Sequence, residues 1–460
     1  MTVLRLPREL AAGAIAAGIL LGVTYTLSPL FIWFLAGAGC LLAIAGRGLD
    51  DRERHWVTVV LAAALLARLA VVLILLAVSP HDSQGALMMF GDEAYAQRRA
   101  LRLRLIWAHM PGSPWDYINA FDEYGWSGFL YLLAYVQLLF GPAPYALRLI
   151  NAALFAGGAL ILFRVIRRAY GFLPALLGMT VLLFLPSLFV WSISLLKESL
   201  YFLLTAATLA ASVAIVRAPT RTMRLRLTGI SVALLVAIAL LRPGGFALTT
   251  TGIAIGLTLW LATRSVRNAG LALLVAVPLT IAAVRLPQVQ TRVMATLQAS
   301  ARMHGGHAFT IGHSYKLLDA GFYTVPTFYT WTLTPAQAGR YVVRALASYI
   351  VVPAPWQIES RAELAYLPEQ VVWYLLVAFA PLGIVAGFRR DALVTWMQIG
   401  YMAAASAGVA LTSGNVGTLI RHRALTTPYL VWFSALGVTV FITWILPHAY
   451  RAEESHAAHR

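Results

Sequence analysis

Two acidic residues, Asp92 and Glu93, stand side by side shortly after a long apolar run. The run 57–79 is 23 residues long with Arg68 as its only charged residue, which is the length of a membrane-spanning helix. A carboxylate at a membrane edge is costly to keep and is therefore a functional candidate. It can act as a general base toward a hydroxyl group or bind a divalent metal ion. The structural alternative is that Asp92 caps a helix predicted over 93–108.

A second charged pair, Lys197 and Glu198, begins a later apolar run that follows Trp191. Lysine is rare in this chain, which has only one other, Lys316. If Glu198 faces Asp92 within a helix bundle, the two carboxylates can share acid–base chemistry or a divalent cation (Mg²⁺ or Mn²⁺). The alternative is a lysine that anchors a helix end at the membrane surface.

Three arginines are candidate ligands of a phosphate group. Arg242 precedes a Gly-rich turn at 243–245, where a guanidinium and exposed backbone N–H groups can hold phosphate oxygens together. The alternative is a helix-breaking turn with an interfacial arginine. Arg421 and Arg423 lie in the segment 413–423, on the predicted outer side, where positive charge is disfavoured. Such exceptions indicate an anionic ligand or, as the alternative, a lipid headgroup.

A long polar segment, 286–370, contains His304, His307 and His313. Their spacing matches no established zinc pattern and no cysteine accompanies them, so the sequence does not favour a metal site there. The apolar stretch 341–352 is followed by Pro-Ala-Pro-Trp, which predicts an interfacial helix with a kinked exit.

The composition is that of a helical membrane protein. Hydrophobic residues make up 60%, charged residues 12%, and the mean hydropathy is +0.76. Soluble domains are roughly 45–50% apolar and about 25% charged. The formal charge of +17 does not indicate nucleic-acid binding, because the arginines fall mostly in short loops between apolar runs, as the positive-inside rule requires.

We predict an all-α polytopic protein with about twelve transmembrane helices. The run 126–140 has 15 residues, which is short for a crossing, and its aromatic residues suit a helix in the outer interface. Both termini are then cytoplasmic, and the segments 80–144 and 286–370 lie outside with eleven of the 18 acidic residues. The predicted spans are 9–25, 28–46, 57–79, 145–163, 172–190, 195–216, 227–241, 246–262, 269–284, 371–388, 393–411 and 425–446.

This topology divides the chain into four regions. Arg68 and Arg148 lie within spans, where pairing or snorkelling explains an arginine better than reaction does. The regions are an N-terminal transmembrane hairpin with a cytoplasmic loop (1–56), a transmembrane core that includes the first outer loop 80–144 (57–284), a long outer loop with interfacial helices (285–370), and C-terminal transmembrane helices with a short cytoplasmic tail (371–460).

In the order of these features the chain resembles the GT-C class of integral-membrane glycosyltransferases, in particular protein mannosyltransferases and lipid A aminoarabinose transferases. The resemblance covers about residues 57–220. It departs from the family in having Asp-Glu instead of a spaced Asp-x-Asp motif, and Lys-Glu at the second carboxylate. The features that match the GT-C class are the span leading to Gly91-Asp92-Glu93-Ala94-Tyr95, the segment from Phe140-Gly141 through Arg148 and Asn151 to Arg164 and Gly171, and the carboxylate Glu198. The C-terminal half contains Pro355-Trp356, Pro368-Glu369-Gln370 and the run from Asn415 to Arg423, and through these it resembles uncharacterised membrane proteins of bacterial exopolysaccharide clusters.

The resemblance implies sugar transfer at the outer face of the bacterial cytoplasmic membrane, in the synthesis of a cell-surface glycan or exopolysaccharide. The donor would be a polyprenyl-phosphate sugar, and the acceptor a hydroxyl group of a glycan, lipid or protein. Asp92 would be the base of an inverting reaction, and Glu93 or Glu198 would orient the base, the acceptor or a divalent cation held by Asp92 and Glu198. The cationic side chains that would bind the donor phosphate are Lys197, Arg242, Arg421 and Arg423.

Two other classes of protein fit the same residues. An O-antigen-type polysaccharide polymerase or ligase would use a diphosphate donor, depend on Arg242, Arg421 and Arg423, and tolerate loss of Asp92. A non-catalytic component that transports or scaffolds a polysaccharide assembly would tolerate both Asp92→Ala and Arg421→Ala. The paired outer acids and bases favour an enzyme.

Overall fold

The computed structural model describes residues 8–79, 88–121, 128–310, 312–324, 330–358 and 360–457. The described chain folds into two compact units. Unit 1 comprises Met1–Leu160, Phe189–Leu204 and Ala237–Pro243, and unit 2 comprises Ile161–Leu188, Thr205–Val236 and Gly244–Arg460. Parts of the two predicted outer segments lie outside the described residues, including the acidic residues Asp82, Asp122, Glu123 and Glu359.

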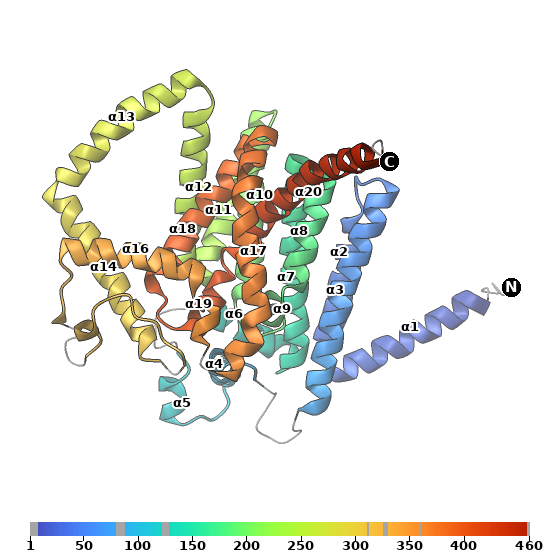
Figure 1. The fold of residues 1–460 in the computed structure, drawn as a ribbon. Coiled ribbons are helices and arrows are strands. Elements are labelled where there is room, and N and C mark those ends of the chain that lie inside the picture. Colours follow the sequence, from blue (N-terminus) through green and yellow to red (C-terminus); the bar gives the residue numbers. More distant parts are fainter. Residues whose placement is uncertain are drawn as a thin grey trace. The chain divides into compact units, whose positions relative to one another are not determined.

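Helices make up nearly all of the described chain (Figure 1), which confirms the all-α prediction. An isolated bridge between Ser314 and Asn415 is the only extended pairing in the described residues. The helices are α1 (Arg8–Leu27), α2 (Pro29–Ala45), α3 (Asp51–Val78), α4 (Gly91–Trp107), α5 (Pro114–Ile118), α6 (Gly128–Phe140), α7 (Pro144–Tyr170), α8 (Phe172–Phe184), α9 (Pro186–Ser192), α10 (Glu198–Arg217), α11 (Arg221–Leu241), α12 (Pro243–Thr263), α13 (Val266–Arg285), α14 (Pro287–Ala308), α16 (Pro335–Val351), α17 (Arg361–Arg390), α18 (Ala392–Thr412), α19 (Val416–Arg423) and α20 (Thr427–Ala457), with 3-10 turns η1 (Ala320–Tyr323) and η2 (Pro355–Gln357).

Eight of the described helices are long and apolar enough to cross a membrane, namely α3, α7, α10, α11, α12, α13, α17 and α20. The pair α8 and α9 forms a ninth candidate that bends by 64° at its break. These candidates coincide with nine of the predicted spans, so a polytopic helical protein is confirmed. The other three predicted spans are helical as α1, α2 and α18 but are not among the candidates, so the count of twelve stays a prediction.

Two short apolar helices show what limits their length. α2 has 17 residues because Ser28 starts it, accepting a hydrogen bond from the Leu30 amide, and Gly46 ends it. The run 126–140, predicted to lie in the interface, is helical from residue 128 as α6. With 13 described residues α6 is not among the candidate spans, and its place in the outer interface stays a prediction.

Glycines allow the closest helix packing in unit 2. α17 and α20 meet where a β-carbon on Gly437 would collide with the Phe379 carbonyl, and one on Gly383 would collide with the backbone of α20. Gly252 and Gly256 of α12 lie equally close to the backbone of α18. Small residues at such spacings let helix backbones approach, which is a main source of helix association in lipid.

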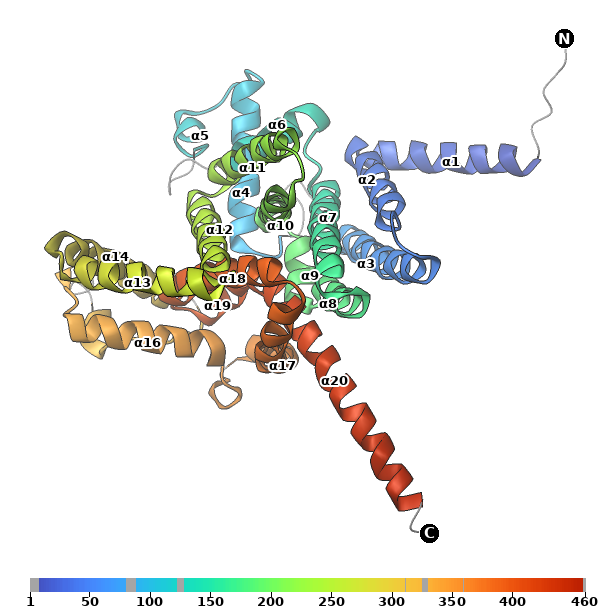
Figure 2. The same cartoon turned by 90° about the horizontal axis from the view of Figure 1, so that it is seen from above.

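The candidate span α13 differs from the others because none of its residues is buried. It leads into α14, which packs against α16 and α18, and Figure 2 shows α14 and α16 side by side. An apolar helix without protein cover suits a lipid environment. The α14–α16 pair therefore forms part of the packed body of unit 2, whereas α13 does not.

We expect Gly437→Ala to lower the apparent melting temperature of the purified protein in detergent. The added methyl group meets the Phe379 carbonyl, and such overpacking costs about 1–3 kcal/mol. Gly229→Ala is the matched control, because nothing lies within 4 Å of a β-carbon at that helical position. Thermal unfolding followed by intrinsic fluorescence measures both variants, and equal melting temperatures would show that this helix contact does not need glycine.

Candidate active site

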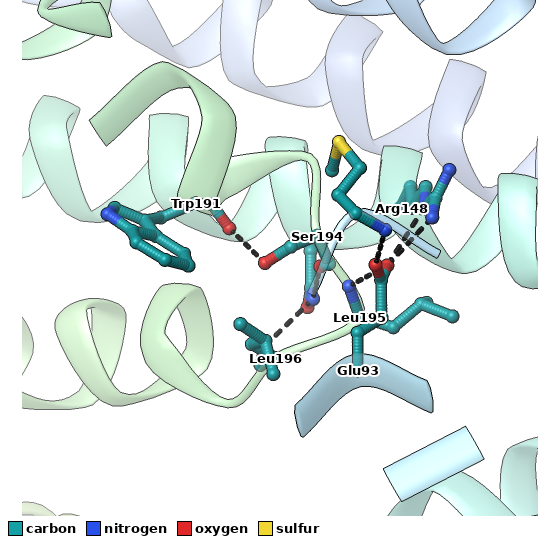
Figure 3. Close-up of polar contacts among 8 residues, drawn as sticks. Glu93, Arg148, Trp191, Ser194, Leu195 and Leu196 are labelled. Carbon is teal, nitrogen blue, oxygen red and sulfur yellow. Dashed lines mark hydrogen bonds and ion pairs between the residues drawn. The ribbon is translucent and has the colours of Figure 1, made fainter. Parts of the chain in front are cut away.

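Glu93 is fully buried, and four hydrogen bonds occupy its carboxylate (Figure 3). Its Oε1 atom accepts from Nε and Nη2 of Arg148, at 3.1 and 2.9 Å, and from the Leu195 amide at 2.9 Å. Its Oε2 atom accepts from the Met89 amide at 2.8 Å. Arg148 is equally buried, so the two charges compensate each other. Glu93 thereby joins the start of α4, the start of α7 and the chain between α9 and α10.

The chain between α9 and α10 is not helical, so its peptide groups need partners from elsewhere. Asn151 of α7 donates to the carbonyls of Ser194 at 2.7 Å and Leu196 at 3.0 Å. Glu93 accepts from the Leu195 amide that lies between them (Figure 3). Irregular backbone at membrane depth is tolerated only where protein groups satisfy it. We define residues 193–197 as the α9–α10 break.

Arg68, within α3, supports the same region from another side. It is fully buried, and its Nε atom donates to the Ser192 hydroxyl at 2.8 Å, while Nη1 donates to the Ala64 carbonyl at 3.1 Å. Its guanidinium also lies 4.6 Å from the centroid of the Phe189 ring. Arg68, like Arg148, therefore has the paired environment predicted for an arginine within a span.

Asp92 is exposed, unlike its neighbour Glu93. α4 begins at Gly91, with Phe90 as the N-cap residue and no side-chain capping hydrogen bond, so the interpretation of Asp92 as a helix cap is wrong. The Phe90 ring stacks on Trp191 at a centroid distance of 4.1 Å. Asp92 thus lies in the first turn of α4, between two residues that contact the region of the α9–α10 break.

Two positively charged residues, Lys197 and Arg242, lie near the start of α10, where Glu198 is found. Glu198 is the first residue of α10 and is largely buried, and Lys197 before it is half-buried. Arg242 follows α11, and its guanidinium lies 5.9 Å from the centroid of the Tyr201 ring. Because Tyr201 is three residues after Glu198, both side chains lie on one face of α10. Lys197, Glu198 and the Tyr201 ring that Arg242 contacts therefore lie within the first turn of α10 or next to it.

Unit 1 thus contains most of the predicted site. Asp92 and Glu198 carry carboxylate oxygens, the ligand type that Mg²⁺ and Mn²⁺ prefer, and the predicted cation site at these two residues stays a prediction. Within the residues that the structure describes, no three His, Cys, Asp or Glu side chains group together as a metal site. The predicted site residues in unit 1 are Asp92, Glu93, Lys197, Glu198 and Arg242.

The other two predicted phosphate ligands lie in α19 of unit 2. Arg423 is buried, and its guanidinium donates to the carbonyls of Tyr349 and Val352 and to Oε1 of Gln370, the last at 3.1 Å. Burial lowers the pKa of this guanidinium. These contacts give Arg423 the role of a brace for the end of α16. Arg421 is only half-buried and is the more accessible of the two.

The histidines of the long segment hold backbone carbonyls. His304 is buried, with Nδ1 2.6 Å from the Ser413 carbonyl and Nε2 2.9 Å from the Tyr323 hydroxyl. Since a carbonyl oxygen only accepts, we assign the proton to Nδ1. Burial lowers the pKa of His304 to about 4. His307 contacts the Thr412 carbonyl through Nδ1 at 2.7 Å, so both rings fix the chain after α18.

The functional roles of Asn151 and Glu369 were not predicted. Asn151 satisfies the α9–α10 break, and Glu369 of unit 2 accepts from the Ser187 amide at 2.8 Å, in the first turn of α9. Their common signal in the sequence is a polar side chain in an otherwise apolar run. A buried polar side chain needs a hydrogen-bond partner, and a backbone group that lacks a helical partner can provide one.

No family model, curated protein or solved structure matches this chain.

We expect Arg148→Met to destabilise the protein strongly, because it leaves the Glu93 carboxylate buried without a counter-charge. Removing one partner of a buried ion pair costs about 3–5 kcal/mol. The double variant Glu93→Gln/Arg148→Met removes both charges and should recover much of that loss. Apparent melting temperatures of the two single variants and the double variant, in one detergent, give the coupling between the two residues.

Asp92→Asn is the control for this cycle, since its side chain is exposed and its melting temperature should stay near that of the unaltered protein. Additive effects of Glu93→Gln and Arg148→Met would show that the pair does not hold the fold.

We expect acid to destabilise unit 2 through His304. Its pKa in the folded state is about 4, below the ordinary value of 6.5, so the unfolded chain binds more protons between these values. The stabilisation is complete above pH 6.5 and is lost as the pH falls toward 4. His304→Gln should flatten the dependence of melting temperature on pH over this window, whereas His55→Gln, near the start of α3, should not. A His304→Gln profile as steep as the wild-type profile would refute the assignment.

Proposed function

We propose that the protein is a membrane glycosyltransferase that transfers a sugar from a polyprenyl-phosphate donor to a hydroxyl group of a glycan, lipid or protein. The observation that carries the proposal is the meeting of the two acidic segments in unit 1. Glu93 bonds to the Leu195 amide and Phe90 stacks on Trp191, so the turn with Asp92 adjoins the break that leads to α10. The location at the outer face of the bacterial cytoplasmic membrane belongs to the same proposal.

Asp92 is the proposed general base, because it is the exposed acid of the pair. It takes the proton of the acceptor hydroxyl as that oxygen attacks the anomeric carbon of the donor sugar. The bond from this carbon to the phosphate oxygen breaks, polyprenyl phosphate leaves with the electron pair, and the configuration inverts. A positioned base contributes roughly 10²–10⁴-fold to such a step.

The positive side chains stabilise the leaving phosphate, whose negative charge grows in the transition state. Lys197 and Arg242 lie at the start of α10, and the guanidinium of Arg242 can hold phosphate oxygens in its planar fork. Arg421, in unit 2, stays a phosphate ligand predicted from the sequence, while Arg423 braces α16. The tail of the donor would lie in lipid among the spans.

The remaining carboxylates orient the reaction. Glu198 would orient the acceptor or, with Asp92, hold Mg²⁺ or Mn²⁺. Glu93 acts through its neighbours: its bonds to Arg148 and Leu195 fix the turn that carries Asp92. Glu93 is therefore a positioning residue in this proposal.

The proposed topology keeps twelve spans, with α1, α2 and α18 added to the nine candidates, in a GT-C-like arrangement. Contacts in unit 2 support its side assignments. Arg217, the last residue of α10, pairs with Asp391, after α17, and Arg390 donates to the Tyr170 carbonyl at the end of α7. All three loops are assigned to the cytoplasm from their arginines, and their contacts with one another support that assignment.

We expect Asp92→Asn to lower sugar transfer at least ~100-fold, because the amide cannot accept the proton. The measurement is transfer of radiolabel from a polyprenyl-phosphate sugar in membranes that contain equal amounts of each variant. Asp51→Asn is the matched control: Asp51 is an exposed acid of unit 1 at the opposite end of α3 from the proposed site. Its activity should equal that of the unaltered protein.

The same assay separates the rival functions. Full activity of Asp92→Asn would contradict the base mechanism, and transfer from a polyprenyl-diphosphate donor that is lost in Arg242→Gln would favour an arginine-led polymerase. Equal transfer by membranes with and without the protein would favour a scaffold or transport component.

A further inference from the structure

A cavity of about 480 Å³ lies in unit 2, within the range of ligand pockets, roughly 300–1,000 Å³. Two segments form its walls: residues 313–316, which follow α14, and residues 348–358, which include the end of α16 and η2. Most of its lining side chains are polar, which suits a ligand rich in hydroxyl groups better than an acyl chain. The lining includes His313, Ser314, Lys316, Ser348, Trp356 and Gln357.

The chain from α18 to α19 fixes the first wall of this cavity. The Val416 amide donates to the His313 carbonyl at 2.9 Å, and the Tyr315 amide donates to the Gly414 carbonyl at 3.1 Å. The Tyr315 hydroxyl also donates to the Ser413 carbonyl, at 2.7 Å. Backbone bonds in both directions therefore hold this wall in place.

Arg423, at the end of the same segment, fixes the second wall through its bonds to the Tyr349 and Val352 carbonyls. The motif that begins at Ser413 and ends at Arg423 thus joins both walls. A pocket that is already formed loses little freedom when a ligand binds. This role accounts for the buried Arg423 without a phosphate bound to it.

Trp356 gives the cavity a flat apolar surface. The residue is 80% exposed, so its ring is accessible to a ligand. The Gln357 amide donates to the Ala354 carbonyl at 2.8 Å, which holds the turn that presents the indole ring. A sugar ring has an apolar C–H face that stacks on an aromatic ring. Its hydroxyl groups can bond to polar side chains such as the side-chain amide of Gln357 and the hydroxyl of Ser348.

Lys316 supplies the net charge of the lining. It is exposed, with Nζ 5.6 Å from the centroid of the Tyr323 ring. The other basic group of the lining, His313, has Nδ1 3.1 Å from Oε1 of Glu363, which is not itself a lining residue. The lining therefore favours a ligand that carries an anionic group.

We propose that this cavity binds an anionic saccharide, with Trp356 stacking on a sugar ring and Lys316 pairing with the acidic group of the ligand. A role as the acceptor site of the transferase rests on the proposed function, but saccharide binding does not. Binding is therefore measured without any donor, so that failure of this inference and failure of the transferase proposal are distinguishable.

The experiment is saturation-transfer NMR and titration calorimetry on the full-length protein in phosphatidylcholine nanodiscs. The probes are trigalacturonic acid and the neutral maltotriose. We expect Trp356→Ala to weaken trigalacturonic acid binding about tenfold, and Trp356→Tyr, which keeps an aromatic face, to restore most of it. Lys316→Met should weaken the acidic probe and remove the salt dependence of its binding, while leaving maltotriose unaffected.

Two controls match these variants. Trp115→Ala removes another highly exposed tryptophan, in α5, and Arg302→Met removes an exposed positive charge on α14; neither should change binding. Equal binding by Trp356→Ala and Trp115→Ala would overturn the proposal. In nanodiscs of phosphatidylglycerol, trigalacturonic acid could fail to bind while the wild type, but not Lys316→Met, binds that lipid. This result would show a lipid-headgroup site instead. If neither trigalacturonic acid nor maltotriose binds, the proposal is also overturned.

Discussion

The fold of unit 1 depends on satisfying the backbone of a break between two helices. α9 ends at Ser192 and α10 begins at Glu198, and between them the Leu195 amide and the carbonyls of Ser194 and Leu196 find their hydrogen-bond partners in side chains rather than in a helix. In apolar surroundings, each unpaired backbone group would destabilise the fold by more free energy than most side-chain contacts contribute. The buried side chains Glu93 and Asn151 supply the partners, and Arg148 compensates the charge that Glu93 brings in. The polar residues of these spans are therefore explained first by the backbone and only then by chemistry.

Unit 2 solves similar problems with similar groups. The first turn of α9 has an amide, that of Ser187, whose acceptor is the Glu369 carboxylate. At the end of α16 the carbonyls of Tyr349 and Val352 receive hydrogen bonds from Arg423. An acid serves where amides are unpaired, and an arginine serves where carbonyls are unpaired, because one only accepts and the other only donates. At these two positions of unit 2, the sign of the buried charge therefore matches the backbone groups that need a partner.

The sequence predicted the helices better than it predicted the roles of their polar residues. Apolar runs of sufficient length appear as candidate spans in nine places, because hydropathy and helix length are local properties. The pairing of Glu93 with Arg148 joins residues 55 positions apart and depends on which helix faces meet, which no local pattern contains. Arg423 illustrates the same limit: its presence in a predicted outer loop marked it as unusual, but the carbonyls that it binds become neighbours only in the fold. The count of twelve spans and the site in unit 1 remain predictions.

Adjacent acids of the same pair take different roles because a helix turns by about 100° per residue. With Glu93 directed into the protein, Asp92 faces outward, and one buried ion pair therefore determines the environment of both. A base must be held within a fraction of an ångström of its working position, and rigid neighbours achieve this better than a mobile loop does. The anchor of Glu93 lies one residue from Asp92 and is tied to the break that leads to Glu198. The Glu93 carboxylate that satisfies the backbone of the break would thus also fix the distance between the two acidic segments. The same carboxylate therefore serves both the fold and the proposed catalytic site.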